Sequence, residues 1–326
     1  MTMDNSVCDD VSKADTYIND IAPIQSRALQ GDSIEHRYFL NVRTDIDENG
    51  EPVIIAPAKT HYVRSYAQRD AYKENIERQQ RRAESGEFSF HSIQAIREMS
   101  MIEDKHCGYL LGLTAYLGYD DIIHNTDRNR TPMSKSDVMS TLGISERTYQ
   151  EFMTTMRRHG IIKDVVVDGI KTYKINRKYV FRGQSYKGLR KIKSFHEQVR
   201  EMYSANNAKD LGFVYKLLPY VHWSTNYLSH NPDETDPDNV STMSRKDLAE
   251  ITKLDEKTLT SKMRRMRIAN NPVFACVRVG DEMEYMLNPE IFYRRDGKPD
   301  DTIIVTFANM VRRSKERSEN RKKRKH

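Results

Sequence analysis

Two stretches of the sequence, 110 residues apart, decide the fold. They read MSKSDVMSTLGISERTYQEFMTTMR over Met133–Arg157 and MSRKDLAEITKLDEKTLTSKMRRMR over Met243–Arg267, and they align without a gap. The identical pairs are Met133/Met243, Ser134/Ser244, Asp137/Asp247, Glu146/Glu256, Thr148/Thr258, Met153/Met263, Met156/Met266 and Arg157/Arg267. Self-similarity at a fixed spacing indicates a duplicated structural module.

Weaker matches extend the repeat on both sides. Upstream, Gly108 and Tyr116 correspond to Gly212 and Tyr220. Downstream, the corresponding pairs are Tyr173/Tyr285, Asn176/Asn288 and Phe181/Phe292. The offset changes by a few residues at positions where loops are expected, so the module covers most of each half of the chain.

The repeated stretch has the pattern of a helix-turn-helix. Ser134 is placed to cap a short helix over 136–142, Gly143 to make the turn, and Ser145 to cap a second helix. In that second helix Tyr149, Phe152, Met153 and Met156 follow helical spacing and predict one buried stripe. A helix, a short turn with glycine and a second helix form a helix-turn-helix.

Each helix-turn-helix is followed by two β-rich runs. In the first copy they cover 161–167 and 170–175, joined by Asp168-Gly169, which favours a tight type I′ hairpin. In the second copy the helices are expected over 245–252 and after Asp255, and the strands over 273–279 and 282–287. A helix-turn-helix followed by a hairpin is a winged helix. The second copy lacks the turn glycine, has Lys262 in place of Phe152, and has Pro272 to end its helix.

We therefore expect a predominantly helical α+β fold with two tandem winged helix-turn-helix modules. An N-terminal extension over 1–91 should begin flexibly and contain a hairpin over about 36–66, around Asn49-Gly50, and a helix over about 67–84. The further divisions are a first module over 92–183, a basic linker helix over 184–206, a second module over 207–311 and a disordered basic tail over 312–326.

The charge balance places the excess of cations in the tail. The chain has 326 residues and a net charge of +6, but Arg312–His326 alone carries +7 and the rest −1. The longest apolar stretch without charge, Cys107–Tyr119, is shorter than the ~18 residues that a membrane span needs. An acidic start, unlike a signal peptide, and three widely spaced cysteines fit a protein of the reducing cytoplasm.

A helix-turn-helix reads DNA with its second helix, whose N-terminal side chains reach base edges in the major groove. Arginines near the helix ends, a wing lysine and the cationic run from Arg177 to Lys193 are expected to hold phosphates. The predicted DNA-binding residues are Ser145, Arg147, Thr148, Gln150, Glu151, Arg157, Arg158, Lys171, Arg177, Lys178, Arg182, Lys187, Arg190 and Lys191 in or after the first module, and Lys257, Thr258, Thr260, Ser261, Arg264 and Arg265 in the second. Arg267 is expected to act with them on phosphate.

The sequence gives little support to an enzyme. It contains no Gly-x4-Gly-Lys phosphate loop and no His-x-His metal motif, and its histidines are scattered. His106-Cys107 has no second Cys or His nearby, and Arg158-His159-Gly160 is explained by the end of a helix. We therefore expect no catalytic residues, no metal and no cofactor.

The phrase that closes each module resembles a known family. Tyr173–Asn176 (YKIN) precedes Phe181-Arg182-Gly183, and Tyr285–Pro289 (YMLNP) precedes Ile291–Arg294 (IFYR). A wing strand ending in this way, followed by an aromatic residue and a basic residue with glycine, resembles the replication proteins of Gram-positive plasmids and their phages. Arg177 stands where the pattern has proline. Two tandem winged helices are also similar to iteron-binding plasmid initiators, and the resemblance implies binding to repeated DNA at an origin.

Three functions remain open on these residues. The first is a plasmid- or phage-type replication initiator that binds double-stranded DNA through two unequal half-sites, as a monomer or homodimer, with the replication machinery as a further partner. The second is a transcription regulator of a phage or mobile element, with the same DNA-binding surface and the transcription machinery as its partner. The third is an adaptor whose corresponding faces bind protein instead of DNA.

Overall fold

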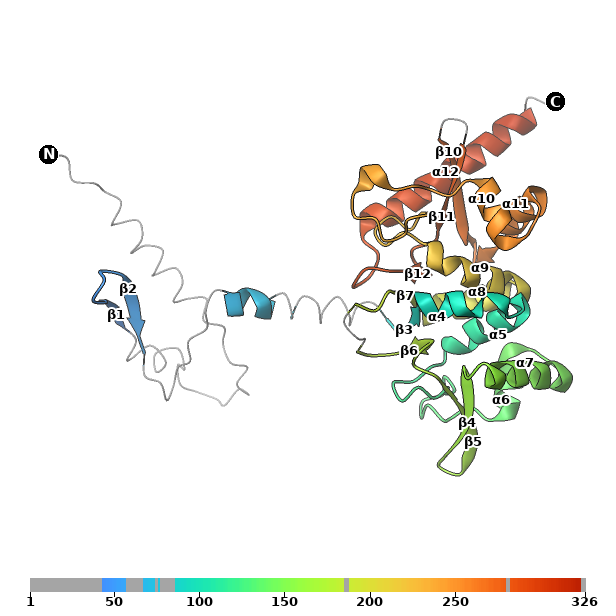
Figure 1. The fold of residues 1–326 in the computed structure, drawn as a ribbon, viewed down its shortest axis with the longest axis horizontal. Helices are drawn as coiled ribbons and strands as arrows, with labels where there is room; N and C mark the ends of the chain where they lie inside the picture. The colour runs from blue at the N-terminus through green and yellow to red at the C-terminus, as the bar shows by residue number, and fades with distance from the viewer. Residues whose placement is uncertain are drawn as a thin grey trace, which may run out of the picture. The chain divides into compact units, whose positions relative to one another are not determined.

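The computed structural model describes residues 43–56, 67–73, 76, 86–184, 188–279 and 282–323. The chain divides into two units, Met1–Ala71 and Tyr72–His326 (Figure 1). In the first unit, strands β1 (Arg43–Ile46) and β2 (Pro52–Ile55) pair antiparallel. Asp47 accepts backbone hydrogen bonds from Asn49 and Glu51 and so closes the turn that contains Asn49-Gly50.

The predicted hairpin is confirmed at this turn, where β1 and β2 pair. The run expected to form its first strand, 36–42, lies outside the described residues, and β1 starts at Arg43. Helical residues follow at 67–73, inside the helix expected over 67–84, and most of the remainder of that range also lies outside the described residues.

The second unit has two halves with the same order of elements, except that the second half adds the β8–β9 hairpin and helix α12. The first half contains β3 (Phe88–Ser92), α4 (Ile93–Glu98), α5 (Asp104–Thr114), α6 (Lys135–Leu142), α7 (Glu146–Arg158), β4 (Ile162–Val167), β5 (Ile170–Ile175) and β6 (Val180–Phe181). The second contains β7 (Lys191–Phe195), α8 (His196–Ala205), α9 (Ala208–Leu217), α10 (Arg245–Thr252), α11 (Glu256–Arg265), β8 (Arg267–Ile268), β9 (Asn271–Pro272), β10 (Phe274–Val279), β11 (Glu282–Leu287), β12 (Phe292–Tyr293) and α12 (Asp301–Lys323). Short 3-10 turns cover Met99–Met101, Leu218–Tyr220 and Pro237–Asn239.

The predicted starts of the first helix in each half are confirmed, because α6 and α10 begin with the same cap. Ser134 caps α6 through a reciprocal pair of hydrogen bonds with Asp137, and Ser244 caps α10 through the same pair with Asp247. Both helices end on a residue in the left-handed conformation. That residue is Gly143 in the first half, with φ 61°, and Lys253 in the second, with φ 54°.

The two hairpins share one register. Ile162 pairs with Ile175 at the base of β4–β5, and Phe274 pairs with Leu287 at the base of β10–β11. The tip of the first is Asp168-Gly169, and both residues have positive φ, as the predicted type I′ turn requires. The second helix ends differently from the prediction: α11 stops at Arg265, and Pro272 lies in β9 of the small β8–β9 hairpin instead of ending the helix.

A four-stranded sheet in the order β12-β7-β3-β6 joins the halves. Strand β3 pairs antiparallel with β7 about the central pair Phe90 and Lys193. The outer strands then pair in matching ways, β6 with β3 through Phe181 and Phe90, and β12 with β7 through Tyr293 and Lys193. This reciprocity is what an approximate two-fold axis through the sheet produces.

Helices α5 and α9 cross on glycines and repeat the same reciprocity. A Cβ atom on Gly108 would lie 1.8 Å from the carbonyl oxygen of Ala208, and one on Gly212 would lie 1.7 Å from that of Asp104. Each half thus contributes one glycine to the crossing, and the backbone of the other half packs directly against that glycine. The two helices approach so closely that no other residue fits at either position.

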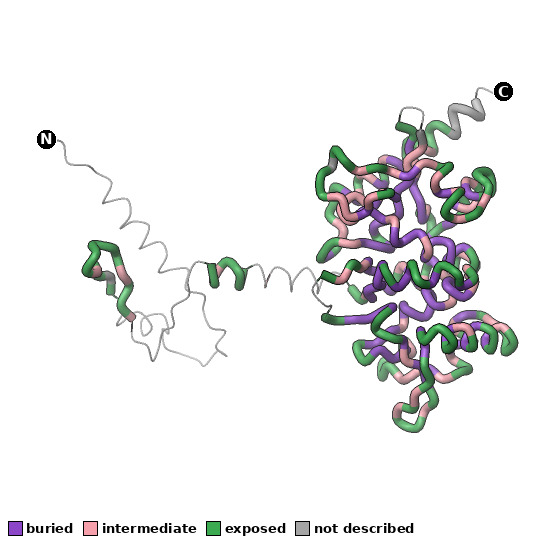
Figure 2. The backbone as a smooth tube through the Cα atoms, viewed as in Figure 1, coloured by how far each residue is buried: buried purple, intermediate pink, exposed green. Residues whose placement is uncertain are grey.

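One hydrophobic core runs through both halves, from α4 and α5 across α9 to α11 and β11. Figure 2 shows the buried chain continuous through the middle of this unit, with exposed chain around it. The prediction of a basic linker helix over 184–206 was wrong. That segment forms β7 and α8, and Ile192, Val199 and Met202 on them are fully buried in the shared core.

The predicted disordered tail was also wrong over its described part. Helix α12 continues through Lys323, and its first turns pack Ile303, Phe307 and Met310 against β10 and β11, where Ala275 and Met286 are buried. Apolar anchoring of the N-terminal half allows the basic second half to continue the same helix. Within the described residues no helix is long and apolar enough to span a membrane.

Candidate nucleic-acid interface

The outer face of α7 carries the residues that the sequence predicted to read bases. The Ser145 hydroxyl caps the helix by accepting a hydrogen bond from the Thr148 backbone amide, and the two hydroxyls lie 3.1 Å apart. Arg147, Gln150 and Glu151 are exposed along the same face, while Thr148 is half-buried. The structure therefore brings the five predicted residues of the first recognition helix together, two of them as parts of its cap.

Acidic side chains neutralise most of the charge on the α7 face. Arg147 Nε donates to Glu151 Oε1 at 3.2 Å, and Lys105 of α5 donates to Glu151 Oε2 at 3.3 Å. These two cations hold the pKa of the Glu151 carboxyl below its usual value. Glu146 likewise accepts from Lys135 and Gln150, which lower its pKa. The α7 face is thus a network of paired charges.

The outer face of α11 has the same cap but fewer acids. The Asp255 carboxylate accepts from the Thr258 amide at 2.9 Å, and Arg245 donates to Glu256 at 2.6 Å, as Lys135 does to Glu146. Lys257, Ser261 and Arg264 are exposed, and Thr260 bonds back to its own helix. Neither Lys257 nor Arg264 forms an ion pair with any described residue, so this face keeps its positive charge.

Two of the arginines expected to hold phosphate are instead tied to carboxylates. Arg157 makes two bonds of 2.8 Å to Asp164 of β4, and Arg265 makes bonds of 2.7–3.1 Å to the buried Asp210 of α9. The carboxylate partner raises the pKa of each guanidinium. Arg267 turns back onto the carbonyl oxygens of Arg264 and Met266. Arg158, exposed beside Arg157, has no such tie among the described residues.

Helices α7 and α11 are fixed to the body by different chemistry at equivalent positions. Phe152 of α7 is fully buried, stacks on His106 with ring centroids 6.1 Å apart, and contacts Tyr109 edge-on at 5.5 Å. Burial lowers the pKa of His106, which favours its neutral form.

In the second half Lys262 takes the place of Phe152. Its ammonium lies 3.4 Å from Asp210, at the position of His106, and 4.7 Å from the ring of Phe213, at the position of Tyr109. An aromatic cluster therefore holds α7 on the body, and an ion pair with a cation–π contact holds α11 at the equivalent positions.

The cationic run after the first hairpin was predicted to follow DNA, and the structure ties its described cations to partners within the chain. Arg182 is 4% exposed and donates to the Leu117 carbonyl oxygen at 3.0 Å, so it cannot reach a phosphate. Arg177 bonds Asp121 at 2.7 Å, and Lys178 bonds Glu98 at 2.5 Å.

The remaining cations of the run lie in or beside β7. Arg190 pairs with Asp233 at 3.0 Å, and Lys191 lies over the ring of Phe90. Lys193 is 2% exposed and donates to the Gly297 carbonyl oxygen. Lys187 lies outside the described residues. On the wing itself, Lys171 is exposed on β5 near the hairpin tip, as predicted. Arg190, Lys191 and Lys193 therefore contribute to the joint between the halves, and binding of phosphate by the exposed Arg177, Lys178 and Arg190 stays a prediction.

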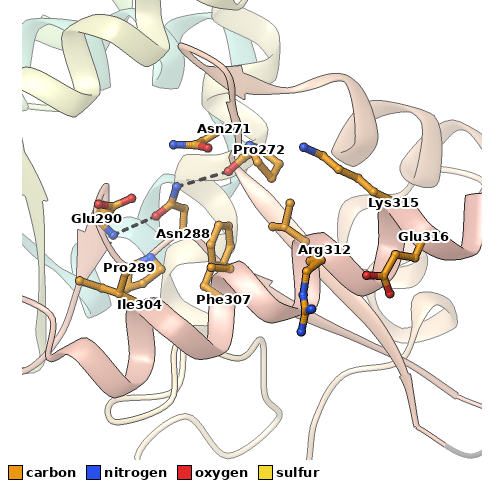
Figure 3. Close-up of a pocket in the computed structure, with 12 residues that line it drawn as sticks. Asn271, Pro272, Asn288, Pro289, Glu290, Ile304, Phe307, Arg312, Lys315 and Glu316 are labelled. Atoms are coloured by element: carbon orange, nitrogen blue, oxygen red, sulfur yellow. Dashed lines mark hydrogen bonds between the residues drawn. The ribbon is translucent and has the colours of Figure 1, made fainter.

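The asparagines of the two closing phrases have a structural role. Asn176 donates to the Gly160 carbonyl oxygen at 2.9 Å and accepts from the Lys178 amide at 3.0 Å. Asn288 makes the corresponding bonds, to the Pro272 oxygen at 3.3 Å and from the Glu290 amide at 3.0 Å (Figure 3). Each asparagine ties the end of a hairpin strand to the segment that leads into that hairpin.

Matching pockets lie beside these asparagines. In the second half a pocket of about 480 Å³ opens between Asn288 and α12, which contributes Ile304, Phe307, Arg312 and Lys315 (Figure 3). In the first half a pocket of about 640 Å³ lies beside Asn176 and the edge of β4, and α7 contributes Arg157 to it. Its charged lining is Asp121, Arg157, Lys163, Asp164, Lys174 and Arg177.

The sequence did not predict a cluster formed by the buried Ser89 of β3, the buried His196 at the start of α8 and the exposed Glu87 just before β3. Ser89 Oγ lies 2.8 Å from His196 Nε2, and His196 Nδ1, 3.8 Å from Glu87 Oε2, lowers the pKa of Glu87 to about 2. Ser89 is fully buried and also donates to the Thr114 carbonyl oxygen, so no substrate reaches it. Only the pairing of β3 with β7 brings these residues together. Their distance in sequence gave no signal.

No group of three or more potential metal ligands occurs within the described parts of the chain. Burial raises the pKa of the Cys107 thiol to about 12, which leaves it protonated. Comparison with protein-family models, with curated proteins and with solved structures finds no match to this chain.

Proposed function

We propose that this chain is a sequence-specific double-stranded DNA-binding protein with two winged helices, acting as a replication initiator of the plasmid or phage type. The observation that carries the proposal is the pair of capped helix-turn-helix segments, each followed by a hairpin of the same register and each presenting an exposed second helix. A helix presented in this way fits the major groove of B-DNA.

The arrangement of the halves supports two half-sites on one DNA. Helices α7 and α11 lie on the same side of the second unit, and the hairpins β4–β5 and β10–β11 extend toward opposite ends (Figure 1). Reciprocal contacts between the halves correspond to those within a two-fold dimer, whose DNA half-sites are inverted. Because the exposed residues of α7 and α11 differ, we expect two inverted half-sites of unlike sequence.

The test is retention of DNA fragments from the genome that carries this gene, followed by sequencing and footprinting at physiological salt. Arg147→Ala and Lys257→Ala each remove one exposed cation from one half and are expected to weaken specific binding by about 1–3 kcal/mol. Lys298→Ala removes an exposed cation outside both helices and serves as the matched control.

The outcomes separate the three functions. Clustered repeats near the gene support the initiator, and dispersed promoter sites support the transcription regulator instead. A footprint shorter than one helical turn would contradict the two-module reading. Binding that salt abolishes for every fragment, with no enrichment, would contradict sequence-specific DNA binding and favour the protein adaptor.

A further inference from the structure

The recognition helices differ most sharply at one pair of equivalent positions, Glu151 in α7 and Ser261 in α11. Both oxygens of the Glu151 carboxylate are engaged, one by Arg147 and the other by Lys105. The side chain remains 43% exposed, so the carboxylate is held in a fixed position at the surface.

In the second half the same surroundings contain no acid. Lys257 stands at the position of Arg147, Lys209 at that of Lys105, and Ser261 at that of Glu151. All three residues are exposed, and neither lysine forms an ion pair with a described residue. One half therefore presents cations neutralised by a carboxylate, and the other presents the corresponding cations alone.

We infer that the two halves divide the work of DNA binding, with Glu151 as the residue that determines specificity. The inference rests on the proposed function. With no acid beside them, Lys257 and Lys209 also attract phosphates of any sequence, so the α11 half supplies more of the sequence-independent affinity. Glu151 is repelled by phosphates. Among the base edges of the major groove, a carboxylate pairs with the amino group of cytosine. The α7 half therefore selects a G·C pair whose cytosine faces Glu151.

The pairing with Arg147 and Lys105 prepares the carboxylate for this role. A glutamate that is already fixed loses little side-chain freedom when it meets a base. If the ion pairs served only to stabilise α7, they would contribute to folding and nothing to the choice of sequence. The two roles therefore differ in what a substitution does to base preference.

The experiment exchanges the two residues in the full chain. Binding of Glu151→Ser, Glu151→Gln and Ser261→Glu is measured on the selected site and on scrambled DNA, at several salt concentrations, and sites are then reselected. Glu151→Ser is expected to raise affinity for scrambled DNA roughly tenfold and to erase the preference at one G·C pair. Glu151→Gln keeps the length of the side chain and is expected to shift that preference from cytosine toward adenine.

Ser261→Glu is the matched reverse substitution. It is expected to lower affinity for both DNAs by a similar factor and to reduce the salt dependence of binding. The inference is overturned if Glu151→Ser binds DNA with an unchanged ratio of specific to scrambled affinity and an unchanged reselected site. In that case the proposed function stands. If the unsubstituted chain binds none of the DNAs, the proposed function and the inference both fail.

Discussion

The two halves of the second unit hold the same backbone with different side chains. In the first half Phe152, His106 and Tyr109 pack as three rings under α7. In the second half Lys262 and Asp210, with Phe213 beneath the ammonium, occupy the same three positions under α11. The second helix in addition has Arg265 bound to Asp210.

This difference shows that the position of a recognition helix is set by contact geometry and not by one kind of interaction. Apolar rings and a nearly buried ion pair are not exchangeable one residue at a time, because a lone buried charge is strongly unfavourable. The three positions must therefore change together. The same contrast appears at the surface, where the α7 face is neutralised and the α11 face remains basic.

The largest change in the free energy of unfolding is expected when the lysine of the Lys262–Asp210 ion pair is introduced at the equivalent position of the first half. Phe152→Lys places a lysine in a fully buried site without an acid and should lower the free energy of unfolding by about 4 kcal/mol. Adding His106→Asp supplies the missing carboxylate and should recover about 2 kcal/mol through coupling. Urea denaturation of both single variants and the double variant measures this. Additive losses would contradict the equivalence of the two sets of positions.

The next largest effect concerns the helix crossing that the halves share. Gly108→Ala and Gly212→Ala each force a Cβ into a backbone carbonyl oxygen and should destabilise the second unit by about 3 kcal/mol, despite the greater helix propensity of alanine. Because the two glycines make equivalent contacts, the two variants should lose similar amounts of stability in thermal unfolding. Glu197→Ala on the exposed side of α8 is the control and should change stability little. Unequal losses would show that the crossing is not symmetric.

The pH dependence of stability should report the joint between the halves. Burial lowers the pKa of His91 to about 3, and its ring bonds Ser194 of β7 at 2.7 Å. The unfolded chain binds a proton near pH 6.5 and the folded chain does not, so stability is constant above that pH and falls as the pH drops from about 6.5 toward 3. The loss from His91 should be about 2 kcal/mol at pH 5. His91→Gln, compared with the unsubstituted chain at both pH values, should flatten the curve. An unchanged curve would assign the loss to other groups.

The smallest effect is expected at the turn between the two helices of each helix-turn-helix. Lys253 has φ 54° where Gly143 has φ 61°, and a side chain in this conformation costs about 1 kcal/mol. Lys253→Gly should therefore stabilise the chain by about that amount, and Gly143→Lys should destabilise it equally. Calorimetric midpoints of both variants test this, and a loss of stability in Lys253→Gly would mean that the lysine contributes contacts of its own.

The local elements of each half were predictable from sequence because their signals lie within a few residues. Ser134 and Ser244 with their aspartates mark the helix starts, and Asp168-Gly169 marks the hairpin tip. The buried stripe of α7, including Phe152 and Met156, follows from spacing alone. The faces of the two recognition helices were predicted for the same reason, and their contact with DNA stays a prediction.

The joint between the halves was not predictable, because it depends on pairing between distant segments. Lys191 and Lys193 give β7 the appearance of a basic linker, yet the Lys193 ammonium is buried against a carbonyl oxygen. Arg182 was likewise expected to bind phosphate, although its guanidinium donates a buried hydrogen bond to the Leu117 carbonyl oxygen. A lone cation in a sequence does not reveal whether its partner is water, a phosphate or the protein itself.

During synthesis, α5 leaves the ribosome roughly a hundred residues before α9, the helix against which it packs. At about 5–20 residues per second this delay amounts to several seconds or more, during which the apolar side of the first half has no cover. Helix α12, which covers β10, is completed last of all. The nascent chain therefore cannot finish folding one half at a time, and we expect its yield in the cell to depend on chaperones that protect the first half until the second emerges.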